Sequence, residues 1–405
     1  MRPRKNLEGG HLLMGQVLNS TLALVGILLS ARYCGPSIFG LFSAIVIAAT
    51  ILIILLDFGA CNWASRQLLI GSITPNNYFK IMRSKALLAF FLALPFSGIL
   101  MIKTQSAWAT LLGLLFPVGG TVALYFQSYL LLLPKNHFKL IKLQVSERLF
   151  WLCVIPLSYF QVEREAIFVI PLILGQISNL MLGPTLAKTS WKEIFSNHYL
   201  RQRQIFKNSS YFGGNSILTN ISIADTLLVT LLIGGNAATG YVLAQRFRNP
   251  LTLGFHAFFA RVRPSVATRN LQNIYLTLKK ESYLIFLNCI GVFLFAFIFA
   301  NYTSEIFGPE YRGIEPTLIL CFASALLSGA NHNLLGIMDV MLIEKWKLSF
   351  LLTAIPLQLI SISTGAMTHG AIGAAVLLLV SSLFITFFAT IKVVKIFKEI
   401  SDSSF

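Results

Sequence analysis

Long runs of apolar residues, separated by short polar segments, dominate the chain. Most runs reach the roughly 20 residues with which a helix crosses the hydrocarbon core of a membrane. Helices are expected because lipid offers the backbone no other hydrogen-bond partners, and the prolines inside several runs predict bends. The pattern predicts about twelve transmembrane helices, near residues 11–31, 38–58, 86–102, 107–133, 149–161, 166–187, 209–233, 237–260, 282–300, 316–337, 347–364 and 370–391.

The distribution of basic residues predicts the orientation of these helices. If the N-terminus is cytoplasmic and the helices alternate in direction, 26 of the 32 Lys and Arg residues fall on the cytoplasmic side and 4 on the other. Cytoplasmic loops of membrane proteins are enriched in Lys and Arg. We therefore expect both termini in the cytoplasm. The same bias accounts for the net charge of +17 without nucleic acid as a partner.

Composition and loop lengths restrict the architecture. Hydrophobic residues make up 56% of the 405 residues and charged residues 12%, about half the charged share of a soluble domain. The longest inner segment, 188–208, is basic and divides the chain into an N-terminal half, 1–187, and a C-terminal half, 209–405. We expect an all-α polytopic membrane protein with two six-helix halves around a central cavity, related by an axis along the membrane normal.

Sequence motifs of common enzymes are absent. The chain has no Gly-Lys-[Ser/Thr] phosphate loop, no HExxH, no GxSxG and no Cys/His cluster, and its five cysteines are scattered singly. Such motifs carry nucleotide, metal and nucleophile chemistry. We therefore expect no catalytic residue, no metal and no cofactor, and a function other than that of an enzyme.

Three charged residues fall deepest within the predicted helices. Asp225 and Arg246 lie about 8 and 9 residues from the outer ends of the seventh and eighth helices, about 12–14 Å deep at 1.5 Å per residue. A salt bridge between them is one interpretation. Arg248 points roughly 200° away from Arg246 around the helix, so the two arginines cannot share a partner. A guanidinium stays charged and binds phosphate through paired hydrogen bonds, so the alternative is contact with an anionic substrate.

Short motifs in both halves resemble one known family. They are Ala31–Phe42, Leu56–Gly59 and Arg66 in the first half, and Asp225, Gly240–Arg246, Pro264 and Ile306–Tyr311 in the second. Over roughly residues 30–320, the chain resembles bacterial polysaccharide and O-antigen flippases. These form the polysaccharide transporter branch of the multidrug/oligosaccharidyl-lipid/polysaccharide exporter superfamily. Some members of the family have fourteen helices, and the twelve expected here match the O-antigen flippases.

The resemblance implies a function and its partners. It implies alternating-access transport of polyprenyl-diphosphate-linked oligosaccharide units, as in O-antigen and lipopolysaccharide biosynthesis, from the cytoplasmic to the outer leaflet of a bacterial inner membrane. The implied partners are this lipid-linked oligosaccharide, membrane lipid, and polysaccharide polymerase and chain-length machinery.

The candidate residues have two kinds of role. Those expected to contact substrate are Arg248, Arg246, Asp225 and, at the outer end of the first helix, Arg32. Those expected to act in gating or coupling are Asp57 and Arg66. The alternative for Asp57 is a helix-end carboxylate that pairs with Arg66 or Lys85.

Other functions remain open at this point. A cation-coupled multidrug antiporter of the same fold would favour unpaired acids in the cavity, whereas the predicted helices hold more deep arginine than acid. A membrane-embedded polysaccharide polymerase or acyltransferase would need a His or acid cluster on a sizeable loop, and the outer loops are short. A structural partner in a polysaccharide assembly complex is the remaining alternative.

Overall fold

The computed structural model describes residues 4–132, 137–195, 202–220, 223–267, 271–341 and 344–403. Every element in these ranges is helical. Eight of the described helices are long and apolar enough to cross a membrane. The predicted all-α polytopic class is therefore confirmed, while the count of twelve crossings and the cytoplasmic placement of the termini stay predictions.

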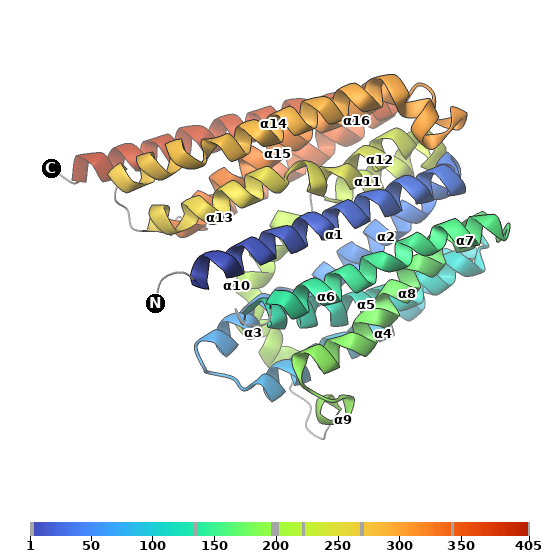
Figure 1. Cartoon of the computed structure of the whole chain (residues 1–405), viewed down its shortest axis with the longest axis horizontal. Coiled ribbons are helices and arrows are strands. Elements are labelled where there is room, and N and C mark those ends of the chain that lie inside the picture. The colour runs from blue at the N-terminus through green and yellow to red at the C-terminus, as the bar shows by residue number, and fades with distance from the viewer. Residues whose placement is uncertain are drawn as a thin grey trace. The chain divides into compact units, whose positions relative to one another are not determined.

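The chain forms two compact units, Met1–Leu227 and Leu228–Phe405, which are described separately (Figure 1). The first unit contains α1 (Arg4–Cys34), α2 (Pro36–Asp57), α3 (Ala60–Leu69), α4 (Pro75–Thr104), α5 (Ala107–Leu132), α6 (His137–Leu149), η2 (Phe150–Cys153), α7 (Val154–Tyr159), α8 (Arg164–Ala187), α9 (Trp191–Ile194) and α10 (Gln202–Asn220). The next helix, α11 (Ala224–Ile233), crosses the boundary between the units.

Small residues allow the helices of the first unit to pack closely. Helix α8 lies against α5 and α6, and α1 lies against α6 (Figure 1). A Cβ atom at Gly183 would lie 2.4 Å from the ring of Phe126, and one at Gly119 would lie 2.7 Å from Gln176. Glycines at such contacts bring backbones together, as is typical of membrane helices.

Two helices of the first unit begin earlier than the hydropathy pattern predicts. Helix α4 begins at Pro75, where the Thr74 hydroxyl accepts a hydrogen bond from the Asn77 amide (3.3 Å). Arg83 and Lys85, expected in a loop, are therefore helical and buried. Likewise α6 begins at His137, well before the expected start near 149. Charged residues interrupt an apolar run in the sequence, but burial and hydrogen bonding allow the helix to continue through them.

The second unit is built around a cluster of phenylalanines. It contains α12 (Gly235–Leu251), α13 (Leu253–Ala267), α14 (Leu271–Phe307), η4 (Pro309–Tyr311), α15 (Glu315–Val340) and α16 (Glu344–Ser403). Phe247 of α12 meets Phe299 and Phe307 of α14 and Phe322 of α15 with ring centroids 5.2–6.4 Å apart. Helix α16 is interrupted at His369 and Gly370, where the sequence predicts a boundary between two helices.

The segment 188–208, predicted as a linker between the halves, lies in the first unit. Within it, α9 starts with a capping box in which the Ser190 hydroxyl accepts from the Glu193 amide and the Glu193 carboxylate accepts from the Ser190 amide. Helix α10 packs against α2 and α3. The division into two six-helix halves stays a prediction.

Candidate functional site

Arg248 lies on α12, one turn before this helix is interrupted. The break between α12 and α13 falls at Thr252, two residues after Pro250, which has no N–H to donate. Asn288 of α14 bridges the break: its Oδ1 accepts from the Gly254 amide (2.8 Å) and its Nδ2 donates to the Leu251 carbonyl (2.8 Å). The interruption is therefore a hydrogen-bonded, defined feature of the second unit.

The guanidinium of Arg248 is half-buried and held by a neutral partner. Its Nη2 donates a hydrogen bond to the Ser328 hydroxyl on α15 (2.8 Å). Within the described residues of the second unit, no carboxylate lies at ion-pair distance from it. This bond uses one of the five N–H donors of the guanidinium.

Asp225 and Arg246 are both shielded from solvent, to different degrees. Asp225 is 2% exposed in the first turn of α11, where its Oδ1 accepts hydrogen bonds from the amide and the hydroxyl of Thr226. A carboxylate is favoured at a helix N-terminus by the helix dipole. Arg246 is half-buried on α12. Asp225 belongs to the first unit and Arg246 to the second, so the salt bridge considered from the sequence stays a prediction.

The predicted seventh helix corresponds to α10 and α11, and residues 221 and 222 between them lie outside the described residues. Asp225 lies in the first turn of α11.

Asp57 lies in a buried polar joint where α2 ends. Its Oδ1 accepts from the Tyr125 hydroxyl (2.8 Å), and the Cys61 amide donates to the carboxylate (3.1 and 3.2 Å). Phe58 and Gly59 have positive φ angles of 46° and 67°, which turn the chain so that the Asp57 carboxylate caps the start of α3.

Lys85 of α4 completes this joint. Its side chain is fully buried, its Nζ donates to the Leu56 carbonyl (2.9 Å), and it interacts electrostatically with Asp57. The same Nζ lies 3.8 Å from the ring centroid of Phe206 on α10, a cation–π geometry. Of the two partners considered for Asp57, the structure thus brings Lys85 close.

Arg66 contacts α10 instead. Its side chain is exposed and its guanidinium lies 5.9 Å from the ring centroid of Phe212. The turn before it also packs against this helix, since a Cβ at Gly59 would lie 2.3 Å from the Phe212 backbone. Asp57 thus bonds within the α2–α3 turn and to α5, and Arg66 contacts α10. Arg32 lies apart from these groups in the sequence, exposed in the last turn of α1.

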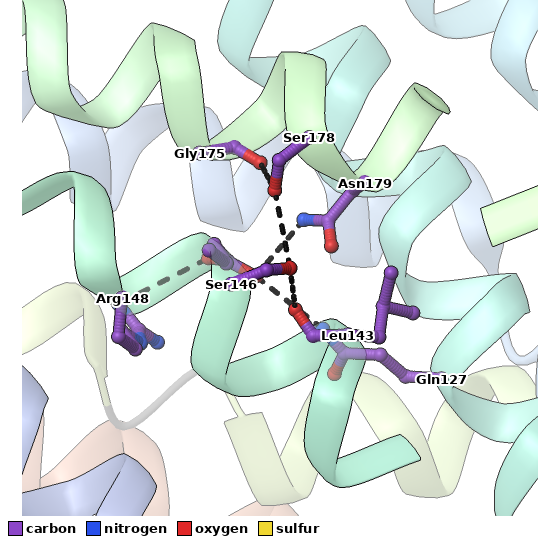
Figure 2. A network of polar contacts seen from close by, with 8 residues as sticks. Gln127, Leu143, Ser146, Arg148, Gly175, Ser178 and Asn179 are labelled. Carbon is purple, nitrogen blue, oxygen red and sulfur yellow. Dashed lines mark hydrogen bonds and ion pairs between the residues drawn. The ribbon is translucent and has the colours of Figure 1, made fainter. Parts of the chain in front are cut away.

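Sequence reasoning missed a network of polar contacts that joins α5, α6 and α8 (Figure 2). Glu147 Oε2 accepts hydrogen bonds from Asn179 Nδ2 (2.9 Å) and Gln127 Nε2 (3.5 Å). Arg148, counted among loop residues in the sequence pattern, follows it within α6. The signal that could have found this network was the presence of polar residues in the apolar runs that form α5 and α8.

Comparison with known families gives one match. A family model described as polysaccharide biosynthesis protein matches residues 8–263. Among curated proteins, no sequence matches the chain.

Solved structures with a similar fold cover nearly the whole chain. Lipid II flippase MurJ, in an inward closed conformation, matches with a TM-score of 0.69 at 13% identity, covering 96% of this chain and 89% of MurJ. A multidrug resistance MATE family transporter of the MOP superfamily, inward-facing, matches with a TM-score of 0.63 at 12% identity over 96% of both chains. The Vibrio cholerae MATE transporter VcmN, in a bent form, matches with a TM-score of 0.61 at 14% identity over 98% of both chains. At these identities the likeness shows the fold, which is that of MOP superfamily transporters.

Proposed function

Because the chain belongs to the polysaccharide biosynthesis protein family, we propose that it moves polyprenyl-diphosphate-linked oligosaccharides across a bacterial inner membrane. It is a multi-pass membrane protein with the fold of flippases and transporters. The cargo we propose is a repeat unit of O-antigen or a similar surface polysaccharide. A polymerase and chain-length machinery would then use the unit at the outer leaflet.

The observation that carries this proposal is the setting of Arg248. A half-buried guanidinium, oriented by the neutral Ser328 hydroxyl, is a costly group within a membrane protein unless it serves a polar ligand or pathway. A diphosphate offers the negative charge and the paired oxygens that a guanidinium binds best. Arg246, a half-buried residue two positions earlier on α12, is proposed as a second contact, with Asp225 balancing its charge and Arg32 at the outer rim.

The transport cycle proposed here moves only the polar head through the protein. The diphosphate and sugars would bind the arginines while the polyprenyl tail stays in the bilayer. Rocking of the two predicted six-helix halves would expose the head first to one side and then to the other.

The joint around Asp57 is proposed as the inner gate. Asp57 and Lys85 fix the end of α2, while Phe206 and Phe212 of α10 cover Lys85 and Arg66 through cation–π contacts. Separation of α10 from this joint would break the cation–π contacts of Lys85 and Arg66, which opposes opening until another interaction compensates.

The test is a charge series at Arg248 in cells, with the leaflet location of the lipid-linked oligosaccharide as the readout. Arg248→Ala should trap the oligosaccharide on the cytoplasmic face and reduce surface polysaccharide, and Arg248→Lys should restore transport only in part because it lacks the planar fork. The matched control is Arg312→Ala, which removes an exposed arginine. Normal transport by Arg248→Ala at normal abundance would remove Arg248 from the proposal.

Depletion of the whole protein separates the alternatives. A flippase predicts cytoplasmic-face accumulation with unchanged drug sensitivity. Single repeat units that reach the outer face without being polymerised would identify a polymerase instead. Unaltered lipid-linked pools with changed drug tolerance would identify a multidrug antiporter.

A further inference from the structure

The last part of α16 changes from apolar to basic along one face of the helix. Phe384, Phe388 and Ile391 follow one another at spacings of three and four residues, and each side chain is at least half exposed. Lys395 and Lys398 continue this spacing and are also exposed. Residues at such spacings lie on one face of a helix. A single face therefore passes from bulky apolar to positively charged side chains near the C-terminus (Figure 1).

This change marks the level of the lipid head groups on the second unit. Helix α16 is long and apolar enough to cross a membrane, so we expect its exposed phenylalanines to face acyl chains. Lysines near the end of such a helix extend their ammonium groups to the membrane surface. Lys395 follows Ile391 by four residues, about 6 Å along the axis. Its charge is therefore directly next to the apolar surface rather than in a distant loop.

An aromatic pair on the first part of α16 lies beside these lysines. Trp346 stacks on Phe350 with ring centroids 5.0 Å apart and ring planes 9° apart. The Nζ of Lys392 lies 5.4 Å from the centroid of the Trp346 ring, a cation–π geometry. Trp346 packs against the apolar core of this unit, which fixes its position. Lys392 is thereby held beside an indole ring, a group that is enriched at membrane interfaces.

The lysines at this end of α16 are not paired with acids. Lys392, Lys395 and Lys398 form no ion pair among the residues that the structure describes. Lys392 and Lys395 are three positions apart, so their side chains are neighbours on the helix surface. Glu399 is exposed and lies four residues beyond Lys395, on the side away from the apolar surface. Two adjacent ammonium groups without an acidic partner favour an anion from outside the chain.

We propose that Lys392, Lys395 and Trp346 bind the phosphate of an anionic membrane phospholipid. The ammonium groups supply charge and hydrogen-bond donors, and the indole N–H is a further donor. The acyl chains would lie along the face that contains Phe388 and Ile391. A phospholipid fits better than a soluble anion because the basic and apolar surfaces are continuous, and basic clusters beside a membrane helix are typical of sites for anionic head groups.

A phosphate bound here would join the two parts of α16. Trp346 lies before the interruption at His369 and Gly370, and the lysines lie after it. At the interruption the two parts are already in backbone contact, since a Cβ at Gly365 would lie 2.4 Å from the Gly373 carbonyl oxygen. The bound lipid would stabilise the opposite end of this pair. The inference does not depend on the proposed function, because it uses none of the residues proposed to contact substrate.

The test identifies the lipid next to Trp346 in vesicles that contain the purified full-length chain. The vesicles are mainly phosphatidylcholine with a minor share of phosphatidylglycerol in both leaflets, and one of the two lipids carries brominated acyl chains, which quench tryptophan fluorescence. The Trp346 signal is the difference between each protein and its Trp346→Phe version. The variants are Lys395→Gln and Lys392→Gln/Lys395→Gln. The matched control is Lys279→Gln/Lys280→Gln, which removes two adjacent exposed lysines of α14 in the same unit.

A phospholipid site predicts that brominated phosphatidylglycerol quenches Trp346 more than its share of the vesicle explains. Lys395→Gln should lower the affinity for phosphatidylglycerol relative to phosphatidylcholine by about fivefold, and the double variant should remove the preference. The α14 control should keep it. An equal preference in the wild type and the double variant would overturn the proposal. An equal loss in the α14 control would do the same, because it would show a general effect of surface charge.

Two further measurements keep the result decisive. If Trp346→Phe does not fold, the rise of the thermal unfolding midpoint with the share of phosphatidylglycerol replaces fluorescence, with the same variants, the same control and the same decision. Arg248→Ala should retain the preference for phosphatidylglycerol. A failure of the lipid site is therefore distinct from a failure of the proposed function.

Discussion

Single buried polar groups in the first unit depend on a few hydrogen bonds each. Asp57 is 4% exposed and is held by the Tyr125 hydroxyl and the Cys61 amide. Its position at the end of an apolar run made it a candidate from sequence alone. Tyr125 could not be found in this way, because it is 68 residues away in the chain and its run is otherwise apolar. Glu147 was missed for a different reason: the charged residues around it placed the predicted start of the fifth helix near 149, after Glu147, whereas α6 begins at His137.

The Tyr125 hydroxyl offers a test at the same scale. Tyr125→Phe leaves the buried Asp57 carboxylate without one donor, and a buried polar group that loses its partner costs about 1–3 kcal/mol. We expect a lower unfolding midpoint in detergent. Tyr159→Phe is the control, since that side chain is 81% exposed, and an equal loss in both variants would argue against a specific role for the Asp57 contact.

At the scale of elements, the break between α12 and α13 is the feature that the sequence pattern did not predict. The hydropathy pattern located α12 and α13 but predicted a single helix there. A proline in a membrane helix is compatible with either a bend or a break, so Pro250 alone did not decide between them. The deciding residue is Asn288, on a different helix. It satisfies one amide and one carbonyl that the break sets free.

Asn288→Ala should therefore destabilise the second unit by about 1–3 kcal/mol, because it leaves two backbone groups without partners. The unfolding midpoint measures this. Asn301→Ala is the matched control. Asn301 is exposed, and within the described residues its side chain hydrogen-bonds only to the Phe297 carbonyl of its own helix. Equal unfolding midpoints for the two variants would show that the break between α12 and α13 does not depend on the Asn288 side chain.

The α2–α3 turn offers a second test between elements. Gly59 and Gly71 both have positive φ, 67° and 74°, so an alanine at either position suffers similar backbone strain. Only at Gly59 does a new Cβ meet the Phe212 backbone, at 2.3 Å, whereas Gly71 has no atom of the described residues within 4 Å. We expect Gly59→Ala to lose more transport than Gly71→Ala at matched abundance. Equal losses would mean that the contact with α10 is not part of gating.

At the scale of the whole molecule, composition and periodicity were sufficient for the class. Long apolar runs and few charges predicted an all-helical membrane protein, and the fold comparison agrees. Sequence was less informative about boundaries between compact units. The basic, polar segment 188–208 predicts a linker, and this stays a prediction; in the structure, α10 begins within it at Gln202 and packs against α2 and α3. Polarity marks contact with water or headgroups but does not identify tertiary partners.

Topology is the prediction that belongs to this scale. Lys103 at the end of α4 and Lys188 after α8 are both exposed and were assigned to opposite sides. In intact cells, a membrane-impermeant thiol reagent should label Lys103→Cys, and Lys188→Cys should react only after permeabilisation. The unsubstituted protein controls for its own thiols, of which Cys34, Cys61 and Cys321 are buried. The reverse labelling would invert the proposed orientation.

The polar character of α6 bears on how the chain enters the membrane during synthesis. Four charged residues lie between His137 and Leu149, and each costs about 2.5–3.5 kcal/mol at the centre of an inserting helix. Helix α8 is apolar, and it supplies the Asn179 amide that bonds to Glu147. The segment from α6 to α7 should therefore wait for α8 and insert with it as a helical hairpin. Nascent chains ending at Val162 should leave that segment open to cytoplasmic protease, and chains extended beyond α8 should protect it.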